Sequence, residues 1–345
     1  MDTLKQAKET KQRQGLWEVE VSYGGEVDLH HHLIDCSKNP DHRKFIPSRQ
    51  LNLSHFPAGC KNDDLLSFTR ALADLTVRVF VNSISPERPE TFPGNSRPYP
   101  LGSCRGRKMS IVGTGRVSSL FRHSQQDNVY PSCPCKECQS SSEKKTQFAL
   151  VVIDTAAHVV SDEIEGKNTT CHLFFDQGSQ PDNCPGVVAL VGSVNVCSNI
   201  DEDWCKLTFV THDTDLITRL EKMVNLWNVL WESIDNKYNK YASSIPERQG
   251  VAPKALPLLY SWHKLTIIVS HPHGCSKQVS IGYCVKRDAI DNRYLYTYST
   301  ATCPGSSGAP VFVFGVSPWW LSTNYVHSGV CEWDPAYNCS GYGSK

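Results

Sequence analysis

Two short motifs, far apart in the chain, constrain its fold more than any other feature. TAAHVV carries His158 directly after an apolar, strand-like run, and GSSGAP carries Ser307 directly before another. Between them lies Asp215, which is followed by leucine. A neighbouring imidazole activates a serine hydroxyl by taking its proton, and a buried carboxylate holds that imidazole in the correct tautomer. We therefore predict a catalytic triad of His158, Asp215 and Ser307, with Asp213 as the second choice of acid.

The order of these residues, histidine then aspartate then serine, is the chain order of chymotrypsin, whereas subtilisin and the α/β-hydrolases use other orders. From about Leu75 to Val330 the chain resembles the trypsin/chymotrypsin-like serine peptidases. The resemblance implies a mainly β fold of two six-stranded antiparallel β-barrels, with the catalytic groups where the barrels meet. It also implies hydrolysis of a peptide or protein substrate through an acyl-enzyme, with no organic cofactor.

Glycines on both sides of the nucleophile predict how it is presented. Gly305 and Gly308 flank Ser307 and allow a sharp backbone turn, so that the N–H groups of Gly305 and Ser307 can form an oxyanion hole. The residue before the nucleophile is Ser306, where secreted zymogens of the resembled family carry an aspartate that pairs with a freed amino terminus. The resemblance therefore implies that no activation through such an ion pair is required.

Two polar residues resemble the primary specificity pocket of glutamyl endopeptidases and picornavirus-type main proteases. These are Thr302 and His327, the latter in the sequence VHSG. A hydroxyl and an imidazole N–H can both donate to a side-chain oxygen, which favours Glu or Gln before the scissile bond. Two alternatives remain open: relatives with HSG that prefer large apolar residues, and a purely structural role for His327. Cys303 and Cys331 occupy positions that the resembled family often joins by a disulfide.

The pattern of apolar residues predicts four parts. Residues 1–60 read as an irregular extension, 61–215 as the first barrel with a helix, 216–258 as a helix and linker, and 259–345 as the second barrel. The tail after Ser307 is short for the last elements of a second barrel, so the completeness of that barrel stays open.

Alternating β-branched and aromatic residues predict the strands, and spacings of three and four predict two helices. The helices are expected from the Asn62 or Asp63 cap to Leu75 and from Leu216 to about Tyr241. The expected strands are Val77–Val81, Met109–Phe121, with a bend at Gly113–Gly115, Phe148–Ile153, Cys171–Phe175, Gly186–Cys197, Cys205–Val210, Lys264–Ser270, Gln278–Val285, Tyr294–Ala301, Ala309–Phe314 and Asn324–Gly329.

Composition limits the partners and the compartment. The 35 basic and 35 acidic side chains give no net charge, so no global field draws the chain to nucleic acid or to an anionic membrane. The polar start, MDTLKQAKETKQRQ, lacks the apolar run of an export signal, so a cytoplasmic location is expected, or a secreted one if the N-terminus is incomplete. The odd number of cysteines, 15, favours free or metal-bound thiols in such a location.

One cysteine cluster is a candidate zinc site. Cys133, Cys135 and Cys138 lie close together in sequence, and Cys171 or His172 could supply a fourth ligand. Free loop cysteines explain the pattern equally well, so we assign no metal to these cysteines. The run His30–His32 is expected to be a solvated polar stretch. The competing function is a catalytically silent, peptidase-like module that binds proteins.

Overall fold

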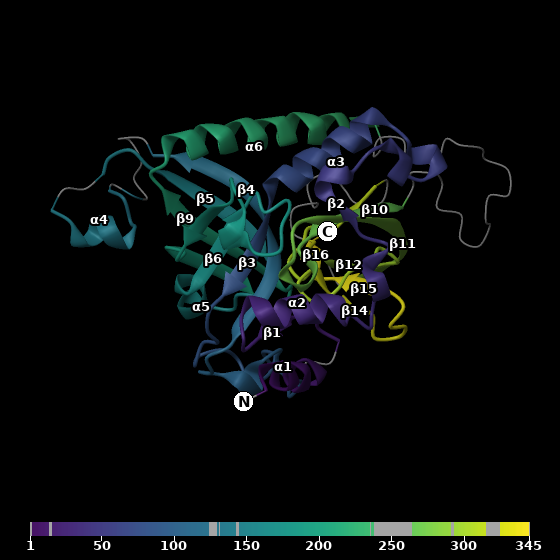
Figure 1. Cartoon of the computed structure of the whole chain (residues 1–345), viewed down its shortest axis with the longest axis horizontal. Coiled ribbons are helices and arrows are strands. Elements are labelled where there is room, and N and C mark those ends of the chain that lie inside the picture. The colour runs from purple at the N-terminus through teal and green to yellow at the C-terminus, as the bar shows by residue number, and fades with distance from the viewer. Residues whose placement is uncertain are drawn as a thin grey trace.

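A computed structural model describes residues 2–13, 16–123, 130, 132–142, 145–234, 236–237, 264–290, 293–314 and 325–344. The chain is mainly β, with two antiparallel sheets and a few helices, as expected from the strand-like segments. The two sheets lie side by side, and the helices α3 and α6 run along one edge of the pair (Figure 1).

The first sheet contains all the strands predicted for the first half of the chain. Its order is β7-β6-β3-β4-β5-β9-β8, and β1 pairs with β4. The segment expected at Gly186–Cys197 forms both β7 and β8, which are separated by a turn at Gly192, where φ is +69°. β7 pairs with β6 and β8 pairs with β9, so this bent segment links the two ends of the ladder. The bounds are β1 Glu20–Ser22, β3 Thr76–Val81, β4 Ser110–Arg122, β5 Ala149–Thr155, β6 Thr169–Leu173, β7 Val188–Val191, β8 Asn195–Asn199 and β9 Trp204–Thr211.

The second sheet has the order β13-β10-β11-β12-β15-β14, with β16 on β12 and β2 on β11. Backbone hydrogen bonds from Val311 to Tyr325 (2.9 Å) and from His327 to Ala309 (2.8 Å) join the chain ahead of β13 to the chain ahead of β14. Among the described residues, the tail after Ser307 supplies the four strands β13 to β16. The bounds are β2 Ile46–Pro47, β10 Leu265–Ser270, β11 Gln278–Ile290, β12 Arg293–Tyr298, β13 Phe312–Val313, β14 His327–Val330, β15 Asn338–Ser340 and β16 Gly343–Ser344.

Both predicted helices form. α3 spans Asp63–Leu75, and the Asn62 side chain caps it by accepting from the Asp64 N–H. α6 spans Thr214–Ile234 and packs against α3 along the edge seen in Figure 1, with the Phe68 and Trp227 ring centroids 4.8 Å apart. The end of the predicted helix and linker, residues 238–258, lies outside the described residues.

The N-terminal extension is ordered, which corrects the prediction of an irregular segment. It contains α1 Thr3–Gln12, β1, and α2 Glu26–Ile34, which carries the three consecutive histidines. Val19 and Val21 are buried, and β1 pairs with β4 from far along the chain. The order of this segment depends on long-range contacts, so local periodicity gave no sign of it. Among the described residues, no helix is both long and apolar enough to cross a membrane.

Candidate active site

The pairing of β5 with β9 brings His158 to a carboxylate. The ladder ends with Thr155 opposite Cys205, so the residues just after β5 and just before β9 meet at one end of the sheet. His158 Nδ1 lies 2.8 Å from both carboxylate oxygens of Asp203, and the His158 backbone N–H donates to the same carboxylate (3.0 Å). The Ser328 hydroxyl also donates to Asp203. All three side chains are buried.

The structure therefore corrects the predicted partner of His158 from Asp215 to Asp203. Asp215 is exposed at the start of α6, beyond the end of β9 where Ala149 pairs with Thr211. The two ends of the ladder, Ala149 and Thr155, are six residue steps apart, which at about 3.4 Å per step is roughly 20 Å. The Asp213 carboxylate accepts from the Asp215 N–H (2.9 Å), so the alternative acid is a cap of α6. Asp203 was missed because nothing but its position ahead of a strand marks it in the sequence.

A buried ion pair fixes the backbone of His158. Arg88 donates to the His158 carbonyl oxygen and to both oxygens of Glu165 (2.8 and 2.7 Å), and neither side chain is exposed. Glu165, in α5 (Glu163–Lys167), also accepts from the Ser161 N–H (2.8 Å). These bonds hold the turn after β5 and so set the direction of the imidazole.

The loop that carries Ser307 packs directly on Thr114 in β4. The Ser307 carbonyl accepts from Thr114 N (2.8 Å), and the Gly305 carbonyl accepts from Thr114 Oγ1 (2.8 Å). Gly305 and Gly308 have φ of +95° and +87°, and a Cβ atom on Gly308 would collide with the Thr114 carbonyl oxygen. The hydroxyl of the buried Ser306 lies 3.1 Å from that of Ser270.

Residues 16–18 of the chain lie in the cleft beside this loop, as an added antiparallel strand along β14. Glu18 N donates to Ser328 O (3.2 Å), and Val330 N donates to Leu16 O (2.9 Å). Trp17 forms a bridge with Gly329, where a Cβ atom would collide with the Leu16 carbonyl oxygen. Main-chain pairing of this kind is how an extended peptide is bound at a sheet edge.

The carbonyl group of Glu18 lies on the predicted nucleophile and oxyanion hole. Ser307 Oγ donates to Glu18 O (2.9 Å), and Gly305 N donates to the same oxygen (3.4 Å). His158 Nε2 is buried without a hydrogen-bond partner among the described residues, and the His158 ring lies 5.0 Å from the Trp17 ring. The structure thus places His158 and Ser307 beside the same segment, residues 16–18. It shows no hydrogen bond between Ser307 Oγ and His158 Nε2.

The side chain of Glu18 occupies the predicted specificity pocket. Its carboxylate accepts from Thr302 Oγ1 (2.8 Å) and pairs with His327 Nε2 (2.7 Å) and the Lys38 ammonium. Burial alone raises the pKa of Glu18, yet Lys38 and His327 outweigh burial and hold this pKa well below its usual range. Lys38 also contacts Asn338 Oδ1 (2.7 Å). Sequence reasoning missed Lys38 because it lies in the extension, far from the motifs.

A tyrosine sets the orientation of His327. The Tyr298 hydroxyl lies 2.8 Å from His327 Nδ1, and burial raises its pKa well above the ordinary value, so it keeps its proton. Burial is also the main reason that the pKa of His327 is lowered. The hydroxyl has one hydrogen and a second acceptor, Cys339 O, at 3.1 Å. When that hydrogen points to Nδ1, the neutral imidazole carries its own hydrogen on Nε2 and donates it to Glu18.

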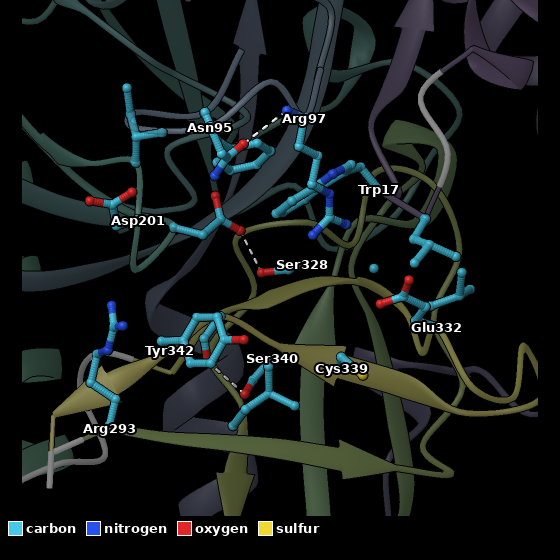
Figure 2. A pocket seen from close by; sticks show the side chains of 18 residues that line it. Trp17, Asn95, Arg97, Asp201, Arg293, Ser328, Glu332, Cys339, Ser340 and Tyr342 are labelled. Atoms are coloured by element: carbon cyan, nitrogen blue, oxygen red, sulfur yellow. Dashed lines mark hydrogen bonds between the residues drawn. The ribbon is translucent and has the colours of Figure 1, made fainter. Parts of the chain in front are cut away.

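A cavity of about 370 Å³ extends the cleft along the residues that precede Glu18. Leu16 and Trp17 line one part of it, and Ser328 reaches into it toward Asp203 (Figure 2). The cleft therefore has room beyond the pocket that holds the glutamate.

Within the described part of the chain, two clusters of cysteine and histidine could hold a metal ion. In the first, His212 Nε2 lies 3.3 Å from Cys133 Sγ and 3.6 Å from the sulfurs of Cys135 and Cys138. The fourth member is thus His212, which corrects the suggested Cys171 or His172. The second cluster was not predicted and contains Cys36, His42, His273 and Cys303. Cys303 lies 3.6 Å from Cys36 and not against Cys331, whose sulfur is near Thr297.

Comparison with known proteins adds little. No family model and no curated protein matches the chain. Two similar solved structures are inactive forms of the protease Rv3671c: one, from M. tuberculosis H37Rv, is a serine-to-alanine mutant at 11% identity, and the other has 12% identity. Each covers 79% of this chain and 83% or 86% of its own, with a TM-score of 0.35 in both cases. Similarity at that level supports no inference about this chain.

Proposed function

We propose that the chain is a serine endopeptidase that cleaves peptide bonds after glutamate. The observation that carries this proposal is the arrangement of Glu18: its backbone is paired like a bound peptide, its carbonyl oxygen lies on Ser307 and Gly305, and its carboxylate is in a polar pocket. The continuity of both β ladders supports the double-barrel fold of the resembled family.

In the proposed mechanism, the Ser307 hydroxyl turns its hydrogen to His158 Nε2, which is buried and unpaired, and Oγ attacks the carbonyl carbon. The N–H groups of Gly305 and Ser307 stabilise the oxyanion. Removing one such donor typically raises the activation free energy by about 3 to 4 kcal/mol. His158 then protonates the leaving amine. Asp203 stabilises the imidazolium and fixes its tautomer, the role first predicted for Asp215.

The pocket favours Glu over Gln. Thr302 and His327 can donate to either side chain, but the Lys38 ammonium adds a charge-assisted bond that only a carboxylate completes. Hydrogen bonds to charged groups contribute about 1.5 to 3 kcal/mol. This supports a narrower specificity than the predicted choice between Glu and Gln.

The test uses the full-length variant Glu18→Lys, in which residue 18 cannot share the pocket with Lys38 and the cleft is open. We expect this variant to cleave peptides with Glu before the scissile bond and to react with a fluorophosphonate probe. Adding Ser307→Ala should abolish both. If the folded Glu18→Lys protein neither cleaves peptides nor reacts with the probe, the catalytically inactive binding module replaces the peptidase.

A further inference from the structure

The chain presents one of its own peptide bonds to its own nucleophile. Ser307 Oγ and Gly305 N both contact the carbonyl oxygen of Glu18, whose bond to Val19 therefore lies at the position of a scissile bond. Resting on the proposed function, we propose that the protein cleaves itself between Glu18 and Val19, and that residues 1–18 block the cleft until then.

The leader, residues 1–18, is held on both sides of this bond. On its N-terminal side, Thr3 Oγ1 donates to Asp28 (2.7 Å) and Lys11 pairs with Glu20 (2.8 Å). On the other side, Val19 is buried and β1 is paired with β4. A tethered segment has an effective concentration of about a millimolar or more, so it excludes peptide substrates present at micromolar levels.

The proposed reaction balances without another reactant except water. Ser307 Oγ attacks the Glu18 carbonyl carbon while its proton passes to His158 Nε2, and that proton then goes to the Val19 nitrogen as the C–N bond breaks. Water next attacks the Ser307–Glu18 ester, giving one proton to His158, and Oγ recovers that proton as the C–O bond breaks. The products are a leader that ends in a carboxylate and a chain that begins with the Val19 amine.

This cleavage opens the cleft by removing an occupant. It does not create the ion pair of secreted zymogens, because Ser306 has no carboxylate to receive the new amine and its hydroxyl contacts Ser270. The chain that remains keeps Lys38, so the pocket retains its cation after cleavage.

Four full-length proteins test the proposal by intact mass and N-terminal sequencing. Wild type should lose residues 1–18 and begin VEVSYGG, while Ser307→Ala and Glu18→Lys should stay intact. Glu9→Lys makes the same charge change at an exposed leader position and should be cleaved like wild type. The half-time should not change with protein concentration, since the bond is already in the cleft.

The outcomes separate this proposal from the proposed function. An intact wild type, together with a Glu18→Lys protein that cleaves glutamyl peptides, overturns self-cleavage and leaves the peptidase. No peptide cleavage by Glu18→Lys overturns both. Cleavage at another bond, or a half-time that shortens in proportion to concentration, contradicts the intramolecular reaction.

A separate observation concerns the unpredicted cluster, Cys36, His42, His273 and Cys303. Its four ligand atoms all lie within 4.8 Å of one another, with Cys303 Sγ 3.6 Å from both Cys36 Sγ and His42 Nε2. Zinc bonds of about 2.3 Å to sulfur and 2.0 to 2.1 Å to nitrogen place tetrahedral ligand atoms about 3.4 to 3.8 Å apart. We propose that this cluster binds a structural zinc ion.

Neighbouring groups orient the ligands for a metal. His273 Nδ1 lies 2.6 Å from the Glu20 carboxylate, which leaves Nε2, buried and without a partner, to face the cluster. Asn39 donates to both sulfurs, from its backbone N–H to Cys36 (3.5 Å) and from its side chain to Cys303 (3.2 Å). Such donors stabilise thiolates, the form that binds zinc.

The site would connect three parts of the active site. Lys38 lies between Cys36 and His42, and Cys303 directly follows Thr302 of the glutamate pocket. The His273 N–H donates to Pro304 O (2.6 Å), next to Gly305 of the oxyanion hole. A bound zinc would therefore fix the position of Lys38 relative to the loop that carries Gly305.

Elemental analysis of the full chain tests this, with Cys138→Ser to remove any metal held at the Cys133 cluster. We expect Cys36→Ser to hold one zinc ion fewer per chain than wild type, Cys138→Ser to keep one, and Cys197→Ser, which changes an exposed thiol outside both clusters, to match wild type. X-ray absorption of Cys138→Ser should show two sulfur and two nitrogen ligands, even if Cys36→Ser does not fold. Zinc absent from Cys138→Ser, or a Cys36–Cys303 disulfide in its place, overturns the proposal.

Discussion

The two ends of the β5–β9 ladder carry different kinds of site. At the end where Thr155 meets Cys205, His158 and Asp203 join groups from residues 16–38, 302–307 and 327–338. At the end where Ala149 meets Thr211, the groups are Cys133–Cys138, which are close in sequence, and His212. The first end brings together side chains from distant parts of the chain, whereas most side chains at the second end are close together in sequence. We expect the first to determine activity and the second to determine stability.

The largest expected difference between the two ends is in their carboxylates. Asp203→Asn should lower kcat by about 10⁴-fold, as in the trypsin example of the same change, because the imidazole takes the wrong tautomer. Asp215→Asn, at the far end, should change kcat less than twofold. Both are measured with a glutamyl peptide in the Glu18→Lys background. A comparable loss from Asp215→Asn would return the orienting role to that residue.

A second test asks whether specificity at the end that carries His158 depends on the charge of the substrate side chain. Lys38→Met removes the pocket cation and should reduce the Glu-to-Gln ratio of kcat/KM by about 10- to 100-fold, the value of a charged hydrogen bond. The rate with Gln should change little. Lys44→Met, an exposed position in the same segment, is the control. An unchanged ratio in Lys38→Met would contradict the role of the cation.

The charge of the Glu18 carboxylate predicts a pH dependence at the end of the ladder that carries His158. The pocket lowers the pKa of Glu18 below its ordinary value of 4.5, so the pocket binds the ionised carboxylate preferentially. The stabilisation of the closed leader by this carboxylate is therefore complete above pH 4.5. For each pH unit below 4.5, the equilibrium constant for opening of the leader should rise by up to about tenfold. Hydrogen exchange of residues 16–20, corrected for the intrinsic rate, measures this in Ser307→Ala. In Ser307→Ala with Glu18→Gln, exchange should not acquire this dependence, and an equal dependence would refute the mechanism.

The smallest expected effect on activity is at the cysteine cluster of the far end. Cys138→Ser should lower the temperature of unfolding, since a structural metal contributes folding free energy, while kcat/KM stays within about twofold of wild type. Cys303→Ser should instead impair glutamyl peptide cleavage by disturbing the loop of Ser307. If Cys138→Ser abolished activity in folded protein, the division between the two ends would fail.

Several elements could be predicted because their signals are local. Apolar alternation gave the strands, Asn62 gave the start of α3, and the TAAHVV and GSSGAP motifs gave His158 and Ser307. Thr302 and His327 were found through the resemblance to the specificity pocket of glutamyl endopeptidases and picornavirus-type main proteases, and the structure places both on one carboxylate. Turn residues, caps and short spacings act over a few neighbours, so a single sequence displays them.

The sequence by itself determined a β-rich chain, its two long helices, and a histidine and a serine in motifs suited to catalysis. Only the tertiary structure decided that Asp203 meets His158, that Lys38 completes the pocket, that Glu18 lies on Ser307, and that His42 and His273 join two distant cysteines. The reason is that strand register and the path of the N-terminal segment select these partners. They depend on pairing between residues far apart in the chain, which no local pattern of side chains encodes.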